Sequence, residues 1–311
     1  MTTSFSPESV RAASLLTNRL VTLDAKPLPA GEFWRLVEQV DPAALLDLDV
    51  AGISELVACG HDDAARYRTL LDASTALMFE QERLLEGGVT LISALDERFP
   101  AAVRERLGST CPPFLLVAGA VDVLGGAALG VVGSRDASAE ALDVAGDAGR
   151  MAAGREWPVI SGLARGVDQA AMAAAIEAGG QAIGIPADGI LLASRNAEVR
   201  GSVHAGQLCL ASPFAPSAPF RAGNALGRNK IIYAMSQIAF VVSADNGSGG
   251  TWGGATEAID RSFAHVAVWT GAGSRPGNAA LVARGATPVS DVAALIDLDP
   301  TIPPPSQDSL F

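Results

Sequence analysis

The chain is poor in the residues that build disulfides, metal sites and histidine-based catalytic centres. It has three cysteines and three histidines in 311 residues. The cysteines, Cys59, Cys111 and Cys209, are odd in number, far apart and outside any C-x-x-C pair, which indicates reduced thiols. The histidines show no metal-ligand spacing. We therefore expect no metal ion and no other cofactor.

Long apolar runs and export signals are also missing. Hydrophobic residues make up 49% of the chain, but no run approaches the roughly twenty uncharged apolar residues that a membrane-spanning helix needs. The opening stretch, MTTSFSPESV, lacks the basic segment followed by an apolar one that is typical of a signal peptide. We expect a cytoplasmic protein with no membrane partner.

Positive charge is scarce and unevenly placed. The formal net charge is −12, which argues against a general polyanion binder. Residues 1–110 hold 17 acidic and 10 basic side chains, whereas residues 211–285 hold six basic and three acidic ones. A local basic face on an acidic protein is compatible with selective nucleic-acid binding.

The hydrophobic pattern divides the chain into four parts. Residues 1–88 have helical periodicity and predict a small helical domain, of the SAM or helix-hairpin-helix kind. Residues 89–126 predict a connector with extended segments that packs on the main domain. Residues 127–298 alternate strands and helices, which predicts an α/β fold with a doubly wound, mainly parallel sheet. The Pro- and Ser-rich residues 299–311 predict a disordered tail.

Within the main domain, short apolar runs bounded by Gly, Ser and Asp predict the strands, and longer periodic stretches predict the helices. The predicted strands are 129–132, 158–161, 181–185, 207–210, 238–243, 266–269 and 286–289. The predicted helices are 138–153, 167–178, 191–200, 224–236, 253–263, 277–284 and 291–296.

Two successive strand-to-helix turns carry small residues and an arginine. The first is Gly133-Ser134-Arg135, and the second contains Ser161, Gly162, Arg165 and Gly166. Backbone N–H groups at such turns, with serine and arginine side chains beside them, suit a phosphate beyond the carboxyl ends of the strands. The alternative is that the glycines only permit tight turns.

Two later segments have similar chemistry. Arg228-Asn229-Lys230 follows Gly227, and we expect this trio at a helix start, where positive charge calls for an anionic partner. The loop Ser248-Gly249-Gly250-Thr251 opens a helix after a strand and is a third phosphate-ready turn. Asn278, near the end of the sheet, is interpreted as structural.

Taken in order, these segments resemble the DprA/Smf family of DNA-processing proteins. The resemblance rests on G-S-R at 133–135, S-G-x-A-R-G-x-D at 161–168, R-N-K for R-N-R at 228–230 and the Gly-rich loop at 248–251. The family's closing G-x-N-x-L-I-x-x-G-A appears as Gly277-Asn278 through Leu281 to Gly285-Ala286. It implies an extended Rossmann-like sheet, a homodimer, and a single-stranded DNA binder that protects incoming DNA and loads the recombinase RecA in natural transformation. It further implies that Arg135, Arg165, Arg228 and Lys230 contact phosphates, that Ser134, Ser161 and Gly162 supply donors, and that 248–251 lines the same pocket.

The chain departs from the family pattern at three places. Ala171-Met172 stands where the family has Ala-His, and Asp188-Gly189-Ile190 is not followed by the usual Tyr-Pro. The acid that usually follows the V-V strand is displaced to Asp245. We also expect no winged-helix domain after residue 297.

Two other functions remain open for the same superfold. The segment 249–257 is similar to a scrambled form of the G-G-x-G-T-x-x-E loop of nucleoside-monophosphate phosphoribohydrolases, in which Glu257 would be the catalytic acid. A nucleotide-sensing module would use the same phosphate site. The Arg-Asn-Lys trio and the N-terminal helical domain favour the DNA-binding hypothesis.

The last residues suggest one more partner. Gln307, Leu310 and Phe311 follow a spacer, Pro303–Pro305, that cannot form a helix. A glutamine followed by two adjacent apolar residues resembles the peptide by which replication and repair proteins bind the bacterial sliding clamp. The alternative is a tail with no binding role.

Overall fold

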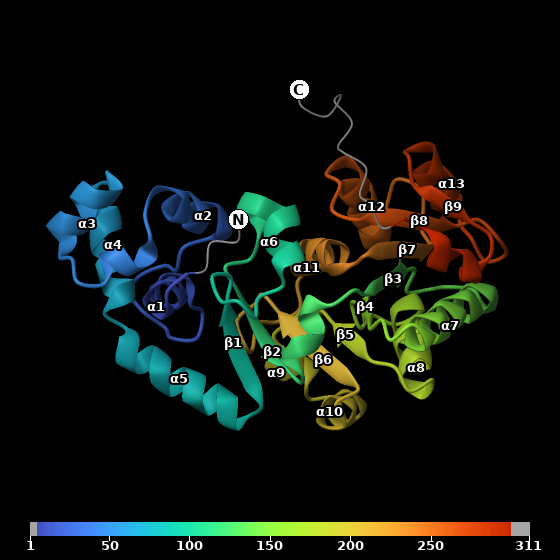
Figure 1. Ribbon diagram of the computed structural model, residues 1–311, viewed down its shortest axis with the longest axis horizontal. Helices are drawn as coiled ribbons and strands as arrows, with labels where there is room; N and C mark the ends of the chain where they lie inside the picture. Colours follow the sequence, from blue (N-terminus) through green and yellow to red (C-terminus); the bar gives the residue numbers. More distant parts are fainter. Residues whose placement is uncertain (1–4, 300–311) are drawn as a thin grey trace.

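The computed structural model describes residues 5–299 and contains a nine-stranded sheet with helices on both faces (Figure 1). The strand order is β1-β2-β6-β5-β4-β3-β7-β8-β9. Neighbours from β6 to β9 pair in parallel, whereas β2 is antiparallel to both β1 and β6. The strands are β1 (Val89–Ser93), β2 (Phe114–Ala118), β3 (Leu129–Gly133), β4 (Val159–Ser161), β5 (Ala182–Gly184), β6 (Leu208–Ser212), β7 (Ile238–Ser243), β8 (His265–Trp269) and β9 (Thr287–Val289).

Two layers of helices cover the sheet. One core unites the sheet with apolar residues of α6 (Ala101–Leu107), α11 (Ala222–Met235), α12 (Gly249–Asp260) and α13 (Pro276–Ala283). The other unites the opposite face with α7 (Ala139–Gly154), α8 (Val167–Glu177), α9 (Ile190–Ala193), α10 (Ala197–His204) and the 3-10 helix η4 (Val292–Asp297). The strands are buried because successive side chains point to opposite, covered faces.

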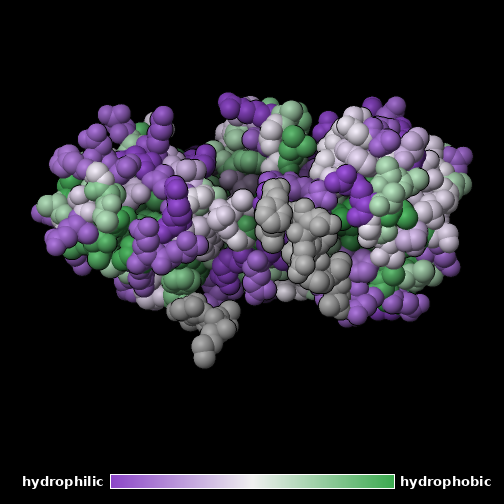
Figure 2. Space-filling model, turned by 90° about the horizontal axis from the view of Figure 1, so that it is seen from above, coloured by the Kyte–Doolittle hydropathy of each residue, from purple (hydrophilic) through white to green (hydrophobic). Residues whose placement is uncertain are grey.

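The N-terminal helices form a separate core at one end of the molecule (Figure 1). They are α1 (Pro7–Thr17), α2 (Ala30–Gln39), α3 (Val50–Val57), α4 (His61–Leu71) and α5 (Ser74–Glu86), with the 3-10 helix η1 (Pro42–Leu45). Side chains cap three of these helices, since Ser6 accepts from the Ser9 N–H, Asp41 from the Ala43 N–H and Asp49 from the Gly52 N–H. Hydrophilic residues cover much of this end in Figure 2.

All seven predicted strands of the main domain are present, and the doubly wound α/β fold is confirmed. Residues 89–126 hold β1 and β2, which belong to the same sheet, together with α6 and the 3-10 helices η2 (Gly108–Thr110) and η3 (Val121–Gly125). The predicted helix 191–200 is in fact two helices, because Asn196 caps α10 with its side chain. The last predicted helix is the 3-10 helix η4. Within residues 5–299, no helix is both long and apolar enough to cross a membrane.

The strand order reverses beside β3. The strands that follow it in sequence, β4, β5 and β6, lie on one side, and β7, β8 and β9 lie on the other. At such a switch point the turns after neighbouring strands leave in opposite directions, and a crevice opens beyond their carboxyl ends. The turns after β3 and β7 therefore delimit the place where this fold binds ligands.

Candidate functional site

A cavity of about 820 Å³ occupies this switch point, and we call it the switch cavity. The turn after β3 lines it with Gly133, Ser134 and Arg135, and the turn after β7 lines it on the other side. Further walls come from α11 and from the first turn of α12, residues Ser248–Thr251, and Asp168 and Arg275 also line the cavity. Three of the segments singled out in the sequence therefore meet around one hollow.

The first turn of α12 is held against β3 and α11 by side-chain hydrogen bonds. The Thr251 hydroxyl donates to the Gly133 carbonyl at 3.0 Å, and the Asn229 amide donates to the Gly250 carbonyl at 3.0 Å. The helix begins at Gly249, whose φ of +85° favours glycine. A helix leaves its first N–H groups without intrahelical partners, so this end of α12 presents donors and a positive dipole end to the cavity. The predicted helix 253–263 began too late, because the glycine-rich segment is itself the first turn.

The turn after β3 leaves the Ser134 and Arg135 side chains at the cavity. The Ser134 N–H donates to the Ser243 hydroxyl at 3.2 Å, which ties the turns after β3 and β7 together. The Ser134 hydroxyl oxygen accepts from the Asp136 N–H at 3.1 Å and can still donate its own proton. Arg135 is exposed, and its guanidinium lies 5.8 Å from the centre of the exposed Phe220 ring. Such an arrangement is a cation–π contact that holds the arginine at the cavity mouth.

Arg228 is a buried cation. It is 5% exposed, and its guanidinium lies 3.9 Å from the carboxylate of buried Asp168. A β-carbon on Gly162 would fall on this guanidinium, so the glycine makes room for the arginine. Burial lowers the pKa of Arg228, and Asp168 opposes that effect. Arg228 lines the switch cavity from within the protein rather than from a solvated turn.

Asp168 fixes the turn after β4. Its carboxylate accepts from the N–H of Gly162 at 3.0 Å and of Ala164 at 3.4 Å. Burial raises the pKa of Asp168, and Arg228 and these N–H donors lower it. The effect of burial is the larger one, because the side chain is almost wholly removed from water. Asp168 closes the 161–168 motif, and its pairing with Arg228 was not predicted from the sequence.

Two donors predicted at this turn are used inside the protein. The Gly162 N–H is taken by Asp168, and the Ser161 hydroxyl donates to the Val131 carbonyl at 2.6 Å within the sheet. Gly166 has a φ of +89°, and a β-carbon there would meet the Ser134 carbonyl, so it packs the two turns together. Arg165 is exposed and lines a second cavity, not the switch cavity.

The Arg-Asn-Lys trio lies inside α11 and not at a helix start. The helix begins at Ala222, and Gly227 does not interrupt it. Consecutive helical residues point about 100° apart, because an α-helix has 3.6 residues per turn. Lys230 accordingly points to α12 and pairs with Glu257 at 2.8 Å. Neither Lys230 nor Glu257 lines the switch cavity or the second cavity that Arg165 lines.

Buried polar atoms without partners also mark the switch cavity. The Tyr233 hydroxyl and the Arg228 Nε have no hydrogen-bond partner among residues 5–299, and both residues line the cavity. An unpaired buried polar group is costly, so such groups call for a ligand or a water molecule. Burial raises the pKa of Tyr233, which keeps its hydroxyl as a donor.

Arg275 is a cavity residue that the sequence analysis did not single out. It pairs with Asp245 at 3.0 Å and donates to the Asp136 carbonyl. Asp245, the acid displaced relative to the family pattern, therefore has an ion-pair partner in Arg275 at the N-cap of α13. Asn278 is structural, as predicted, since its amide donates to the Val242 and Trp269 carbonyls and accepts from the Ala244 N–H.

The predicted tail contacts Gln307, Leu310 and Phe311 lie outside the described residues.

Comparisons with known proteins agree on the kind of fold and on the family. The family model described as DNA recombination-mediator protein A matches residues 90–298. The structure of DNA processing protein A (DprA) from Streptococcus pneumoniae is similar, with 21% identity, a TM-score of 0.68, and coverage of 87% of this chain and 98% of that one. DNA processing protein A from Helicobacter pylori, whose structure concerns a single-stranded DNA binding mode, is 19% identical, with a TM-score of 0.57 and coverage of 67% and 94%. No curated protein matches the chain.

Proposed function

Because the chain belongs to the DNA recombination-mediator protein A family, we propose that it binds single-stranded DNA through phosphates in the switch cavity. A DNA-processing role in recombination follows from the family; the strand specificity and the residues are our proposal. The observation that carries it is the convergence of the α12 N-terminus, Ser134, Arg135 and buried Arg228 on one cavity. Each of these groups favours an anion.

The shape of the site supports a single strand over a duplex. Arg228 and Tyr233 are buried, so a phosphate or base must enter the cavity to reach them. In a duplex the bases are paired and the backbones are held on a rigid helix, whereas the backbone of a single strand bends freely into a pocket. The relative from Helicobacter pylori, whose structure concerns single-stranded DNA binding, supports the same choice.

The test is a comparison of two arginine variants by fluorescence anisotropy with a labelled oligo-dT. Arg135→Ala removes the exposed cation at the cavity mouth and should weaken binding about tenfold or more, the loss expected for one charge-assisted contact. Arg83→Ala removes an exposed arginine on α5, far along the sequence and paired with Glu80, and should leave the affinity unchanged. Equal effects of the two variants, or no binding by the folded wild type, would refute the proposed site.

We further propose that the bound strand is protected and handed to the recombinase RecA in the cytoplasm, and that the protein acts as a homodimer. The family's role in recombination supports the first part. A shortened lag of RecA filament formation on single-stranded DNA tests the transfer, and sedimentation equilibrium tests the dimer. If the protein binds DNA but leaves the lag of RecA filament formation unchanged, the proposed transfer to RecA is wrong and the proposed strand binding still stands.

A sliding-clamp contact through Gln307, Leu310 and Phe311 also remains our proposal. Two adjacent apolar side chains in a peptide suit a pocket, and the glutamine amide suits its polar edge. A labelled peptide covering Pro303–Phe311 should bind purified clamp with micromolar affinity. The doubly substituted peptide, Leu310→Ala with Phe311→Ala, should not bind; failure of the native peptide at high clamp concentration would reject the contact.

A further inference from the structure

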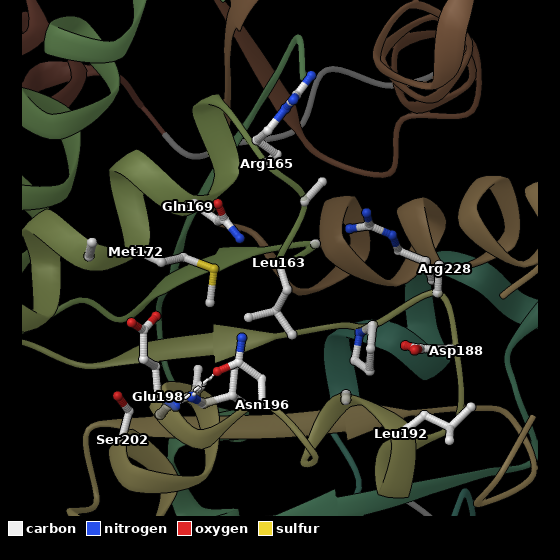
Figure 3. Close-up of a pocket in the computed structure, with 18 of the residues that line it drawn as sticks. Leu163, Arg165, Gln169, Met172, Asp188, Leu192, Asn196, Glu198, Ser202 and Arg228 are labelled. Carbon is white, nitrogen blue, oxygen red and sulfur yellow. Dashed lines mark hydrogen bonds between the residues drawn. The ribbon is translucent and has the colours of Figure 1, made fainter. Parts of the chain in front are cut away.

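A second cavity, of about 870 Å³, continues from the switch cavity along the sheet between α8 and α10, and we call it the α8–α10 groove. Four residues line both hollows: Arg135, Ala164, Phe220 and Arg228. A strand whose phosphate lies in the switch cavity therefore has the mouth of this groove beside it. Figure 3 shows the groove with Arg228 at one side and Arg165 above.

The inner walls of the groove carry apolar side chains. Leu163 and buried Met172 line it from the α8 side, and Leu192 lines it from α9 (Figure 3). Leu163 has a left-handed backbone, with a φ of +59°, that places its side chain over Gly184 at the end of β5. A leucine in this conformation is strained, and such strain persists where the surroundings hold a side chain in a required place.

Two side-chain amides point into the groove between these walls. Gln169 points in from α8, and Asn196 points in from the start of α10 (Figure 3). The Asn196 oxygen is already used, because it accepts from the N–H of Glu198 at 2.8 Å and of Val199 at 3.3 Å. The Asn196 NH₂ group is therefore the part that faces the groove, and it can only donate.

The charges in the groove are unsuited to phosphate. Glu177, Asp188 and Glu198 line it, while its arginines, Arg135, Arg165 and Arg228, gather toward the mouth. These carboxylates would repel a phosphate bound close to them. An occupant that enters from the switch cavity must leave its phosphate at the mouth and insert an uncharged part.

Two departures from the family pattern fall in this groove. Met172 occupies the place of the pattern's histidine, and Leu192 lies in the segment that lacks Tyr-Pro. Met172 puts an apolar side chain where the pattern has a histidine, whereas Leu192 stands at the position of the pattern's proline, which is itself apolar. The change at Met172 makes the groove more apolar, which favours an uncharged base over a charged group.

We propose that one base of the bound strand enters the α8–α10 groove, and that Glu198 and Asn196 select a base with an exocyclic amino group, such as cytosine. This inference rests on the proposed function. The Glu198 carboxylate accepts from the amino group at cytosine N4, and the Asn196 amide donates to the adjacent ring nitrogen. Thymine has a carbonyl in place of the amino group and an N–H in place of that nitrogen, so it reverses both hydrogen bonds.

The test compares oligo-dC with oligo-dT of the same length, two pyrimidine strands that stack weakly. The full-length wild type should bind oligo-dC about fivefold more tightly, the factor that corresponds to one net hydrogen bond. Glu198→Gln replaces the carboxylate by an amide of the same shape and should abolish this preference. Asp143→Asn removes an equal charge from α7, outside the groove lining, and should preserve the preference.

A second pair of variants tests the donor. Asn196→Asp keeps an oxygen that caps α10 but loses the NH₂ group, and it should weaken oligo-dC binding more than oligo-dT binding. Ala197→Asp adds the same charge one residue away, outside the groove lining, and should weaken both equally. Equal affinity of the wild type for the two oligomers, or an undiminished preference in Glu198→Gln, would overturn this inference alone. Failure to bind either oligomer would overturn the proposed function with it.

Discussion

At the scale of single residues, the switch cavity depends on the buried pair of Arg228 and Asp168. Removing a guanidinium and a carboxylate from water is expensive, and at 3.9 Å their attraction offsets part of that cost. Asp168 gains further from the Gly162 and Ala164 N–H groups, whereas the Arg228 Nε has no partner among residues 5–299. Arg228 is thus the member of the pair with unused donor capacity, which a bound phosphate can take up.

Removing the charge of Asp168 from this pair should strongly destabilise the protein. Asp168→Asn keeps an oxygen that accepts from the turn but removes the charge that balances Arg228. We expect the free energy of unfolding to fall by about 3–5 kcal/mol, the cost of leaving one buried charge alone. Urea denaturation followed by circular dichroism measures it.

Removing the second charge supplies the control. In the Asp168→Asn background, Arg228→Leu eliminates the unpaired cation and should restore part of the lost stability. A double variant that is less stable than Asp168→Asn alone would contradict the pairing.

The three thiols should differ in reactivity. Burial raises the pKa of Cys111 and of Cys209 to about 12, against an ordinary value of 9.0, while Cys59 is half-buried. A raised thiol pKa means that burial favours the neutral form; this contribution to stability is complete below pH 9 and is lost as the pH rises toward 12. At pH 8, iodoacetamide should label Cys59 in the native protein and the other two only in urea, as mass spectrometry can show. Native labelling of Cys209 at the rate of Cys59 would contradict its burial.

At the scale of elements, Gly166 and Gly227 have different structural roles. Gly166 has a positive φ, and a β-carbon would approach the Ser134 carbonyl to 2.4 Å. Gly227 lies within α11, where nothing within 4 Å would meet a β-carbon. The first glycine lets the turns after β3 and β4 pack together, and the second weakens a helix.

The two alanine substitutions should therefore have opposite signs. Gly166→Ala should lower the free energy of unfolding by about 1–3 kcal/mol through strain and the steric clash. Gly227→Ala should raise it by about 0.5–1 kcal/mol, because alanine loses less backbone entropy in a helix. Thermal or urea unfolding of the two variants measures both values, and a destabilised Gly227→Ala would show that its space is needed.

The strands were predictable from sequence because each is a short apolar run between turn residues, such as Leu129–Val132 before Gly133. The places of individual side chains were not, since they depend on tertiary contacts. Arg228, Asn229 and Lys230 are consecutive, yet they reach Asp168, the Gly250 carbonyl and Glu257 respectively. Helical geometry therefore directs three consecutive side chains of one motif to three different neighbours. The pairing of β2 with β6 joins distant segments and has no local signal.

At the scale of the whole molecule, the acidic helices and the switch point of the sheet lie in different parts of the structure. The acidic N-terminal helices form one end, and the switch point of the sheet lies within the other part of the molecule (Figure 1). An acidic surface repels nucleic acid in general and leaves binding to the place where arginines and a helix N-terminus converge. This arrangement suits a binder that recognises a strand locally rather than one that coats any polyanion.

The position of Glu257 argues against the hydrolase alternative. Glu257 pairs with Lys230 and lies 3.8 Å from Arg261, and it does not line the switch cavity among the described residues. Incubation with nucleoside monophosphates should release no free base, and Glu257→Gln should leave DNA binding unchanged. Chromatographic detection of base release that is lost in Glu257→Gln would instead establish an enzyme.

The central claim, that the switch cavity binds the backbone of a single strand, is tested most directly by a salt titration. Labelled oligo-dT and a duplex of the same length are compared between low and high salt. We predict that the protein binds oligo-dT more tightly than the duplex, and that log K falls linearly with log salt with a slope of about −2. This is the slope for three neutralised phosphates at about −0.7 each. Arg135→Ala should make that slope shallower by about one phosphate's share. Affinity that is independent of salt, or equal for the single strand and the duplex, would contradict the account.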